Sequence, residues 1–160
     1  MPMGVYFCVY AGCLFLQWSV MPFIAIKEIE PNLPLICLLL WTLRQSRMFG
    51  TLAGFFSGLF TDLLAGGVWG REALAKTVVG YLVPVSGSRL GFQLPLLFVF
   101  LLSMSFIHEG LLLFMASWHE LGSLPKLMLR YAIPGAVYTA LLGCLLDMAI
   151  RFFAKRREYR

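Results

Sequence analysis

The chain has 160 residues, of which 60% are hydrophobic and 13% are charged, and its formal net charge is +5 at pH 7. Soluble globular domains carry roughly 25% charged residues and about 45–50% apolar ones, so this chain has too little polar surface to cover a water-soluble globule. Several apolar runs reach the ~18 residues typical of a membrane span. Composition therefore excludes a soluble domain and predicts an all-α polytopic membrane protein, with residues 1–160 forming one transmembrane domain.

The apolar runs predict about six transmembrane helices, some of them short or kinked. The first run lacks the basic start and the cleavage site of a secretory signal, so we expect it to be a retained span. The runs at 33–43 and 73–85 are short for a hydrocarbon core of ~30 Å, so four full spans with two half-spans stay an alternative. The predicted spans are 5–26, 33–43, 48–65, 73–85, 92–118 and 126–150, followed by a basic tail at 151–160.

Lysine and arginine residues predict the orientation, because they are enriched in cytoplasmic loops. With six spans both termini lie on one side, and that side holds most of the basic residues. We therefore expect both termini to be cytoplasmic. The basic residues of this side are Arg44, Arg47, Arg89, Arg151, Lys155, Arg156, Arg157 and Arg160. Those of the other side are Lys27, Arg71, Lys76, Lys126 and Arg130.

The third predicted span carries glycines four residues apart, at Gly50, Gly54 and Gly58, with Asp62 at the next step. Residues spaced by four stay on one broad helix face, and Gly-x-x-x-Gly lets another helix approach closely in lipid. We predict a helix-packing or partner interface on this face, with a neighbour either within the chain or in another protein. Ser57 lies on a different side of the helix, so we expect it to tolerate leucine better than Gly58 does.

Three ionisable residues fall in the outer half of the predicted membrane region: Asp62, Lys76 and Glu109. Charges in lipid are costly and mark paired or functional sites. A structural ion pair, a partner or ligand site and a proton relay are all open interpretations of this outer-leaflet charge cluster. We favour a Lys76–Asp62 pair, because a short loop joins their helices. Near the other end, Asp147 and Arg151 have i,i+4 spacing and are expected to pair at the interface.

No catalytic motif is recognisable in the sequence. His108-Glu109 and His119-Glu120 begin like the H-E-x-x-H zinc motif, but the second histidine is absent from both. The four cysteines lie in apolar runs without a C-x-x-C pair, so we interpret them as small core residues. We predict that the chain is not an enzyme and that it holds no metal or cofactor.

The C-terminal tail places Phe152 and Phe153 beside several basic residues. Such a segment suits anionic membrane lipid at the cytoplasmic surface, and it equally suits a signal that sets the topology. Nucleic-acid binding is not expected in so short a juxtamembrane segment. The basic residues of the tail are Arg151, Lys155, Arg156, Arg157 and Arg160.

An ordered set of residues stands out between the first and fourth predicted spans. In chain order it is Pro31-Asn32, Trp41, Arg47, Gly50, Gly54-Phe55, Gly58-Leu59, Asp62-Leu63-Leu64, Gly66, Gly70, Ala73-Leu74 and Gly80-Tyr81-Leu82. This set resembles the central pattern of the MreD family of rod-shape membrane proteins. The rest of the chain agrees with that family in length, hydropathy and its basic C-terminus.

The resemblance implies a non-catalytic scaffold in the bacterial inner membrane. This scaffold belongs to the cell-elongation machinery, which synthesises lateral peptidoglycan. The resemblance also implies MreC as the direct partner, with the actin-like MreB, the RodA glycosyltransferase and its transpeptidase partner reached indirectly. A homodimer within such a complex stays open. The family is also similar in architecture to the substrate-binding S component of vitamin transporters. The alternative function is therefore an S-component-like subunit that captures a small molecule.

Overall fold

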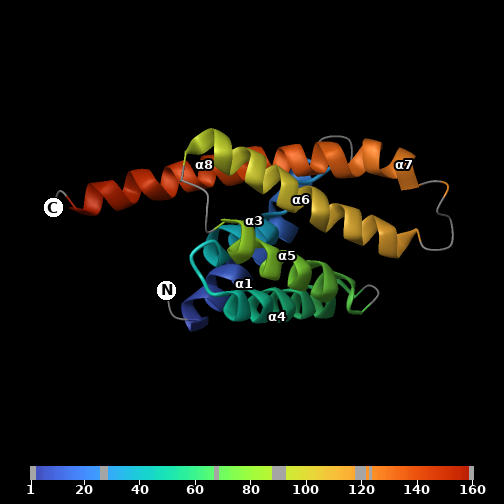
Figure 1. The fold of residues 1–160 in the computed structure, drawn as a ribbon, viewed down its shortest axis with the longest axis horizontal. Coiled ribbons are helices and arrows are strands. Elements are labelled where there is room, and N and C mark those ends of the chain that lie inside the picture. Colours follow the sequence, from blue (N-terminus) through green and yellow to red (C-terminus); the bar gives the residue numbers. More distant parts are fainter. Residues whose placement is uncertain are drawn as a thin grey trace.

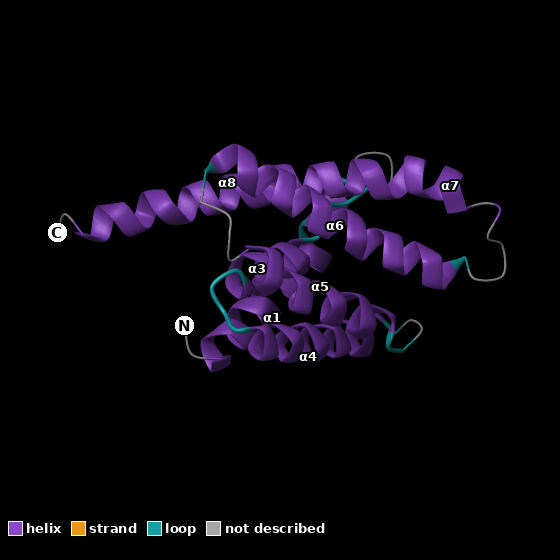
Figure 2. Cartoon of the chain, viewed as in Figure 1, coloured by secondary structure: helices purple, strands orange, loops and turns teal. Residues whose placement is uncertain are grey.

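The structure is a computed structural model that describes residues 3–25, 29–66, 69–87, 93–117, 122 and 124–158. Within these residues the chain is helical apart from short connections (Figures 1 and 2). The helices are α1 Met3–Ser19, α2 Met21–Ile24, α3 Leu33–Thr42, α4 Arg47–Ala65, α5 Arg71–Gly87, α6 Leu94–Ala116, α7 Leu124–Leu127, the π-helical turn η2 Met128–Ala132, and α8 Ile133–Glu158.

The described helices confirm the prediction of an all-α membrane protein. Three segments are long and apolar enough to cross a membrane, namely α4, α6 and Leu124–Phe152, and α1 and α3 contribute shorter apolar helices. Two helices extend beyond the predicted spans. Helix α5 begins at Arg71, before the predicted start at 73, and α8 continues to Glu158, so residues 151–158 of the predicted basic tail are helical.

Short sequence signals explain where several helices begin and end. The side chain of Asn32 accepts a hydrogen bond from the backbone N–H of Leu35 at 3.0 Å and caps α3, which has Pro34 in its first turn. Helix α4 ends at Gly66, whose positive φ of 63° favours glycine. The π-helical turn η2 ends two residues before Pro134, which has no N–H to offer the carbonyl group of Arg130, four residues earlier.

The helices form two layers in Figure 1. Helices α6, α7 and α8 make one layer, and α1, α3, α4 and α5 make the other. The two layers meet where α3 and α5 contact α6. The turn after α3 and the end of α8 lie toward the left of the view, which we call the tail end. The loop after α4 and the start of α7 lie toward the right, which we call the loop end.

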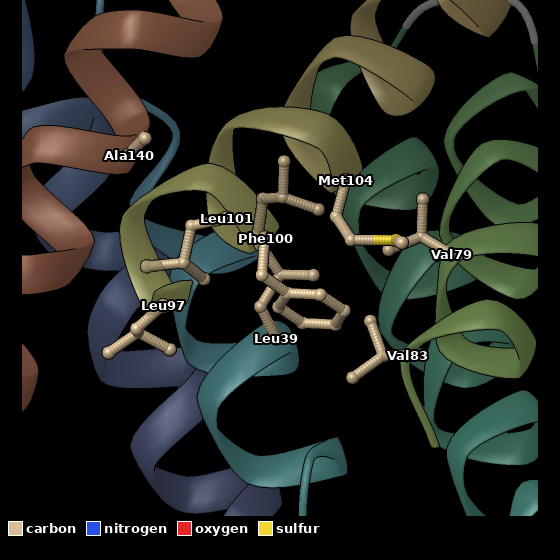
Figure 3. Close-up of a cluster of buried hydrophobic side chains, with 9 residues drawn as sticks. Leu39, Val79, Val83, Leu97, Phe100, Leu101, Met104 and Ala140 are labelled. Carbon is tan, nitrogen blue, oxygen red and sulfur yellow. The ribbon is translucent and has the colours of Figure 1, made fainter. Parts of the chain in front are cut away.

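Apolar side chains fill the space between the two layers (Figure 3). In this view the side chains of α6 lie between α8 on one side and α3 and α5 on the other. Because lipid is as apolar as the core, close packing holds such helices together and burial from water does not. The residues labelled are Leu39, Val79, Val83, Leu97, Phe100, Leu101, Met104 and Ala140.

Candidate functional site

Helices α4 and α5 form the most extensive helix pair of the described chain. A Cβ atom added at Gly54 would collide with the backbone carbonyl oxygen of Lys76, and one added at Gly58 would collide with the backbone of Ala73. A Cβ atom at Gly50 would meet the carbonyl oxygen of Gly80 in the same way. The predicted glycine face therefore lies against another helix of the same chain.

A proline on α5 helps to explain the contact at Gly50. Pro84 lies inside α5 and has no N–H, so the carbonyl group of Gly80, four residues earlier, lacks its usual helical donor. That carbonyl group faces Gly50, and the two glycines approach each other reciprocally. Glycine Cα–H groups can act as weak donors to such an oxygen where helices touch. Side chains would hold the two backbones apart, so glycine is required at both positions.

Asp62, near the end of α4, caps the beginning of α5. Its carboxylate accepts hydrogen bonds from the backbone N–H groups of Gly70 at 3.0 Å, Glu72 at 3.1 Å and Ala73 at 3.0 Å. The first N–H groups of a helix have no partner inside that helix, and the positive end of the helix dipole favours an anion there. Asp62 is only 5% exposed, so these donors replace the water that its carboxylate would otherwise need.

The acidic partner of Lys76 is Glu72 and not Asp62, which corrects the pair favoured from the sequence. The Nζ atom of Lys76 lies 2.9 Å from Oε2 of Glu72, one helical turn away on α5. It also donates to Oγ1 of Thr61 at 2.8 Å and lies 5.7 Å from the ring centroid of Tyr10. Lys76 is 1% exposed, and these contacts compensate for removing its charge from water.

His108 of α6 extends the charged group to the second layer. Its Nε2 atom lies 3.2 Å from the same Oε2 atom of Glu72, and its Nδ1 atom lies 3.5 Å from Oε1 of Glu109. The second distance is long for a hydrogen bond, and Nδ1 is without a closer partner. A protonated imidazole can donate at both nitrogens. The positive charges of Lys76 and an imidazolium at His108 would then balance the negative charges of Glu72 and Glu109.

Two tyrosines of α1 connect the first helix to α4. The hydroxyl group of Tyr6 lies 2.7 Å from Oγ of Ser57, and the hydroxyl group of Tyr10 donates to the Ser57 carbonyl oxygen at 3.0 Å. The Tyr10 hydroxyl group is also 2.9 Å from Oγ1 of Thr61, the atom that accepts a hydrogen bond from Lys76. Ser57 is fully buried and bound to Tyr6, so leucine there would also have to displace a neighbouring side chain. That leucine is better tolerated at Ser57 than at Gly58 stays a prediction.

The predicted outer-leaflet charge cluster is therefore part of a larger polar network at the loop end. The structure places Asp62, Lys76 and Glu109 in one region but gives each a different partner. Glu72 was not among the predicted charged residues, because it falls in the predicted loop before residue 73, although its i,i+4 spacing from Lys76 was a usable signal. The network consists of Tyr6, Tyr10, Ser57, Thr61, Asp62, Glu72, Lys76, His108 and Glu109.

The geometry of this network favours a structural role. Its hydroxyl, ammonium and carboxylate groups bind one another or the backbone and join α1, α4, α5 and α6. Arg71 adds a further connection, donating to the carbonyl oxygen of Leu112 on α6 at 3.1 Å. Among the residues that the structure describes, no three His, Cys, Asp or Glu side chains are placed to hold a metal ion.

At the tail end, the predicted interfacial pair forms: Nε of Arg151 lies 2.6 Å from Oδ2 of Asp147. The backbone at Lys155, Arg156 and Arg157 is helical, but the positions of their side chains lie outside the described part. Other residues used for the sequence predictions also lie outside the described residues. They are Ile26, Lys27, Glu28, Arg89, Phe92, Trp118, His119, Glu120, Ser123 and Arg160.

Comparison with known proteins identifies one family. The sequence model of the family described as "MreD: rod shape-determining protein MreD" matches residues 2–157 of the chain. The match thus extends beyond the central pattern to the first and last helices. No curated protein and no solved structure matches.

Proposed function

Since this chain belongs to the MreD family of rod shape-determining membrane proteins, we propose that it is a non-catalytic scaffold of the cell-elongation machinery. In this role it binds MreC directly. It associates with MreB, RodA and the transpeptidase partner of RodA only indirectly. It lies in the inner membrane as a multi-pass protein with both termini in the cytoplasm. Its contribution to peptidoglycan synthesis is to position other proteins.

One observation carries the proposal: the charged and hydroxyl groups of the network bind one another or the backbone, whereas the exposed side between α1 and α4 is an apolar groove. The groove has a volume of about 500 Å³ and is lined by Phe7, Ala11, Phe56, Leu59, Phe60 and Leu63. Its lining comes from the middle of α1 and the second half of α4. A rigid bundle with such a groove suits binding of a single partner helix and offers no reactive group.

The groove is also the surface on which we expect a partner helix to pack. The glycine face of α4 is occupied by α5, so it cannot receive MreC. Association in lipid depends on shape and close packing, and Ala11 leaves space between the phenylalanines of the groove. We propose that the transmembrane helix of MreC packs there against α1 and α4.

Recovery of MreC from native membranes tests this function. The full-length protein, extracted in a mild detergent, should retain MreC in stoichiometric amount. Ala11→Trp, which fills the groove, should reduce that recovery at least about tenfold, the effect of losing 1.4 kcal/mol of binding energy. Ala149→Trp, at an exposed position of α8, is the matched control and should retain MreC.

The possible outcomes distinguish an error in the proposed binding site from an error in the proposed function. Full MreC recovery with both tryptophan variants would exclude the α1–α4 groove but keep the scaffold. Absence of MreC from the wild-type preparation would contradict the scaffold itself. Reporter fusions after Arg47 and Arg160 should report cytoplasm, and a fusion after Gly70 should report the opposite side; a reversed pattern would overturn the proposed orientation.

The alternative function, a substrate-binding S-component-like subunit of a vitamin transporter, has less support. Such a subunit needs polar and aromatic side chains around a cavity that opens at the loop end. The groove described above is apolar, and a second cavity has its polar residues at the tail end. A vitamin that co-purifies with the protein in place of MreC would favour this alternative.

A further inference from the structure

Two cysteines lie on the wall of the second cavity, which is enclosed by α1, α3, α6 and α8. Cys13 belongs to α1 and Cys37 lies halfway along α3, and these two helices pack against each other. Both cysteines are half-buried free thiols, and their side chains form a hydrogen bond across the helix pair. No sequence motif links the two residues, so the packing of α1 on α3 creates the pair.

The cavity beside the thiols also presents two aromatic rings. Tyr6 and Trp41 line it, and their rings are stacked with centroids 4.2 Å apart. Tyr6 lies two helical turns from Cys13 on α1, and it therefore shares a helix face with that thiol. Trp41 lies one turn from Cys37 on α3 and shares a face with it in the same way. A molecule in the cavity would thus meet both thiols and a flat aromatic surface.

The size and chemistry of the cavity suit a flat, uncharged ligand. Its volume is about 590 Å³, within the range of roughly 300–1,000 Å³ usual for small-molecule sites. Its wall beside the thiols is apolar and includes Ile36 and Leu40. Stacked aromatic rings favour a further planar ring, so the site fits a planar apolar ring better than a flexible chain alone.

A pair of thiols gives this ligand a reaction. A disulfide places its two sulfur atoms about 2.05 Å apart, so thiols that already touch across a helix pair are suited to form one. Formation of the bond requires an acceptor of two electrons, and inside a membrane this acceptor must dissolve in lipid. Quinones have a planar, uncharged ring and accept two electrons together with two protons.

From this arrangement we propose that Cys13 and Cys37 form a redox-active dithiol, which a lipid-soluble quinone bound in the cavity oxidises to a disulfide. The two S–H bonds break and one S–S bond forms. The two electrons and two protons pass to the quinone, whose two carbonyl groups become the hydroxyl groups of a quinol. The reaction is stoichiometric and joins α1 to α3 covalently, so the protein itself stays non-catalytic. It goes beyond the scaffold role and does not depend on MreC.

Oxidation of the purified full-length protein without oxygen tests the proposal. The protein is reduced, freed of reductant and mixed in a mild detergent with decylubiquinone, whose ring is fully substituted. The wild-type protein should convert one quinone to quinol per chain, measured by the change in ultraviolet absorbance. Its mass should fall by that of two hydrogen atoms, and peptide mapping should find Cys13 linked to Cys37. A wild-type protein that forms no quinol would overturn the proposal.

Serine variants identify the reacting thiols. Cys13→Ser and Cys37→Ser should each abolish quinol formation. Cys8→Ser and Cys144→Ser remove cysteines that do not line the cavity, and both variants should form quinol as the wild-type protein does. Unchanged quinol formation in Cys13→Ser, or a disulfide that includes Cys8 or Cys144, would overturn the proposal.

A further variant tests whether the quinone reaches the thiols through the cavity. Leu40→Trp fills part of the space and should abolish the reaction with decylubiquinone. Diamide is a small oxidant that needs no quinone site, so it should still form the Cys13–Cys37 disulfide in this variant and thereby show that the thiols keep their contact. Equal quinol formation by Leu40→Trp and the wild-type protein would overturn the proposal. So would a wild-type protein that diamide oxidises and decylubiquinone does not.

Discussion

The two main helix pairs of this protein are held together in different ways. Between α4 and α5 the backbones touch, because glycines face carbonyl groups directly. Between α6 and α8 the contact is made by side chains: a Cβ atom added at Gly143 would meet the terminal Cδ1 atom of Leu101 at 2.9 Å. The end of a leucine side chain can move, whereas a helix backbone cannot move without separating the two helices. The first pair should therefore be intolerant of added atoms and the second tolerant.

The largest expected effect is at the α4–α5 contact. Gly54→Ala places a Cβ atom against the carbonyl oxygen of Lys76, so it should lower the free energy of unfolding by about 3 kcal/mol or more, the upper part of the range for overpacking. Thermal unfolding in a mild detergent measures the loss. Gly12→Ala is the matched control, since no atom lies within 4 Å of an added Cβ there. Equal stability of the two variants would contradict the direct backbone contact between α4 and α5, on which the comparison of the two helix pairs depends.

Removing the buried cation should have the next largest effect. Lys76→Met leaves Glu72 with only His108 beside it, and breaking a buried pair costs roughly 3–5 kcal/mol. Because the Glu72 side chain is 21% exposed, water should reduce this to about 2–3 kcal/mol. A double-mutant cycle on thermal stability checks the assignment.

That cycle should also identify the partner of Lys76. Adding Glu72→Gln should recover at least about 1 kcal/mol of the loss, the signature of coupled residues. Adding Asp62→Asn should give an additive result, because Asp62 binds backbone N–H groups. Rescue by Asp62→Asn in place of Glu72→Gln would contradict the geometry of the network.

A smaller effect is expected at the cap of α5. Asp62→Asn replaces one acceptor oxygen by an amino group and should destabilise the protein by about 1–2 kcal/mol, as loss of a helix cap does. The change should appear locally, as faster amide hydrogen exchange at Glu72 and Ala73. Asp147→Asn, far from α5, should leave the exchange of these two amides unchanged; a uniform increase across all helices would argue against a local cap.

The smallest effect is expected in the α6–α8 pair. Gly143→Ala should change stability by less than about 1 kcal/mol, because a shift of the Leu101 side chain offsets the gain in helix propensity. The measurement is the same thermal unfolding used for Gly54→Ala. A loss as large as that of Gly54→Ala would show that the two helix pairs are equally rigid and would contradict the comparison.

Much of the helical framework follows from the sequence. Apolar runs locate the long helices, because lipid leaves backbone groups no partner except within a helix or a closed sheet. The spacing of Gly50, Gly54 and Gly58 indicates a close helix contact from periodicity alone. The i,i+4 rule likewise predicts the Asp147–Arg151 pair. These features are local, so no knowledge of neighbouring helices is needed to predict them.

What only the tertiary structure decided is which groups meet across helices. Asp62 lies next to the first turn of α5, where its carboxylate accepts hydrogen bonds from backbone N–H groups. Lys76 therefore forms its ion pair with Glu72. Ser57 looks like a surface position on an isolated helix but is buried by Tyr6 of α1. The sequence by itself determined the helices and the spacing of small and charged residues along them. Their partners depended on how the helices pack, because a buried polar group binds whichever donor or acceptor the neighbouring helix places beside it.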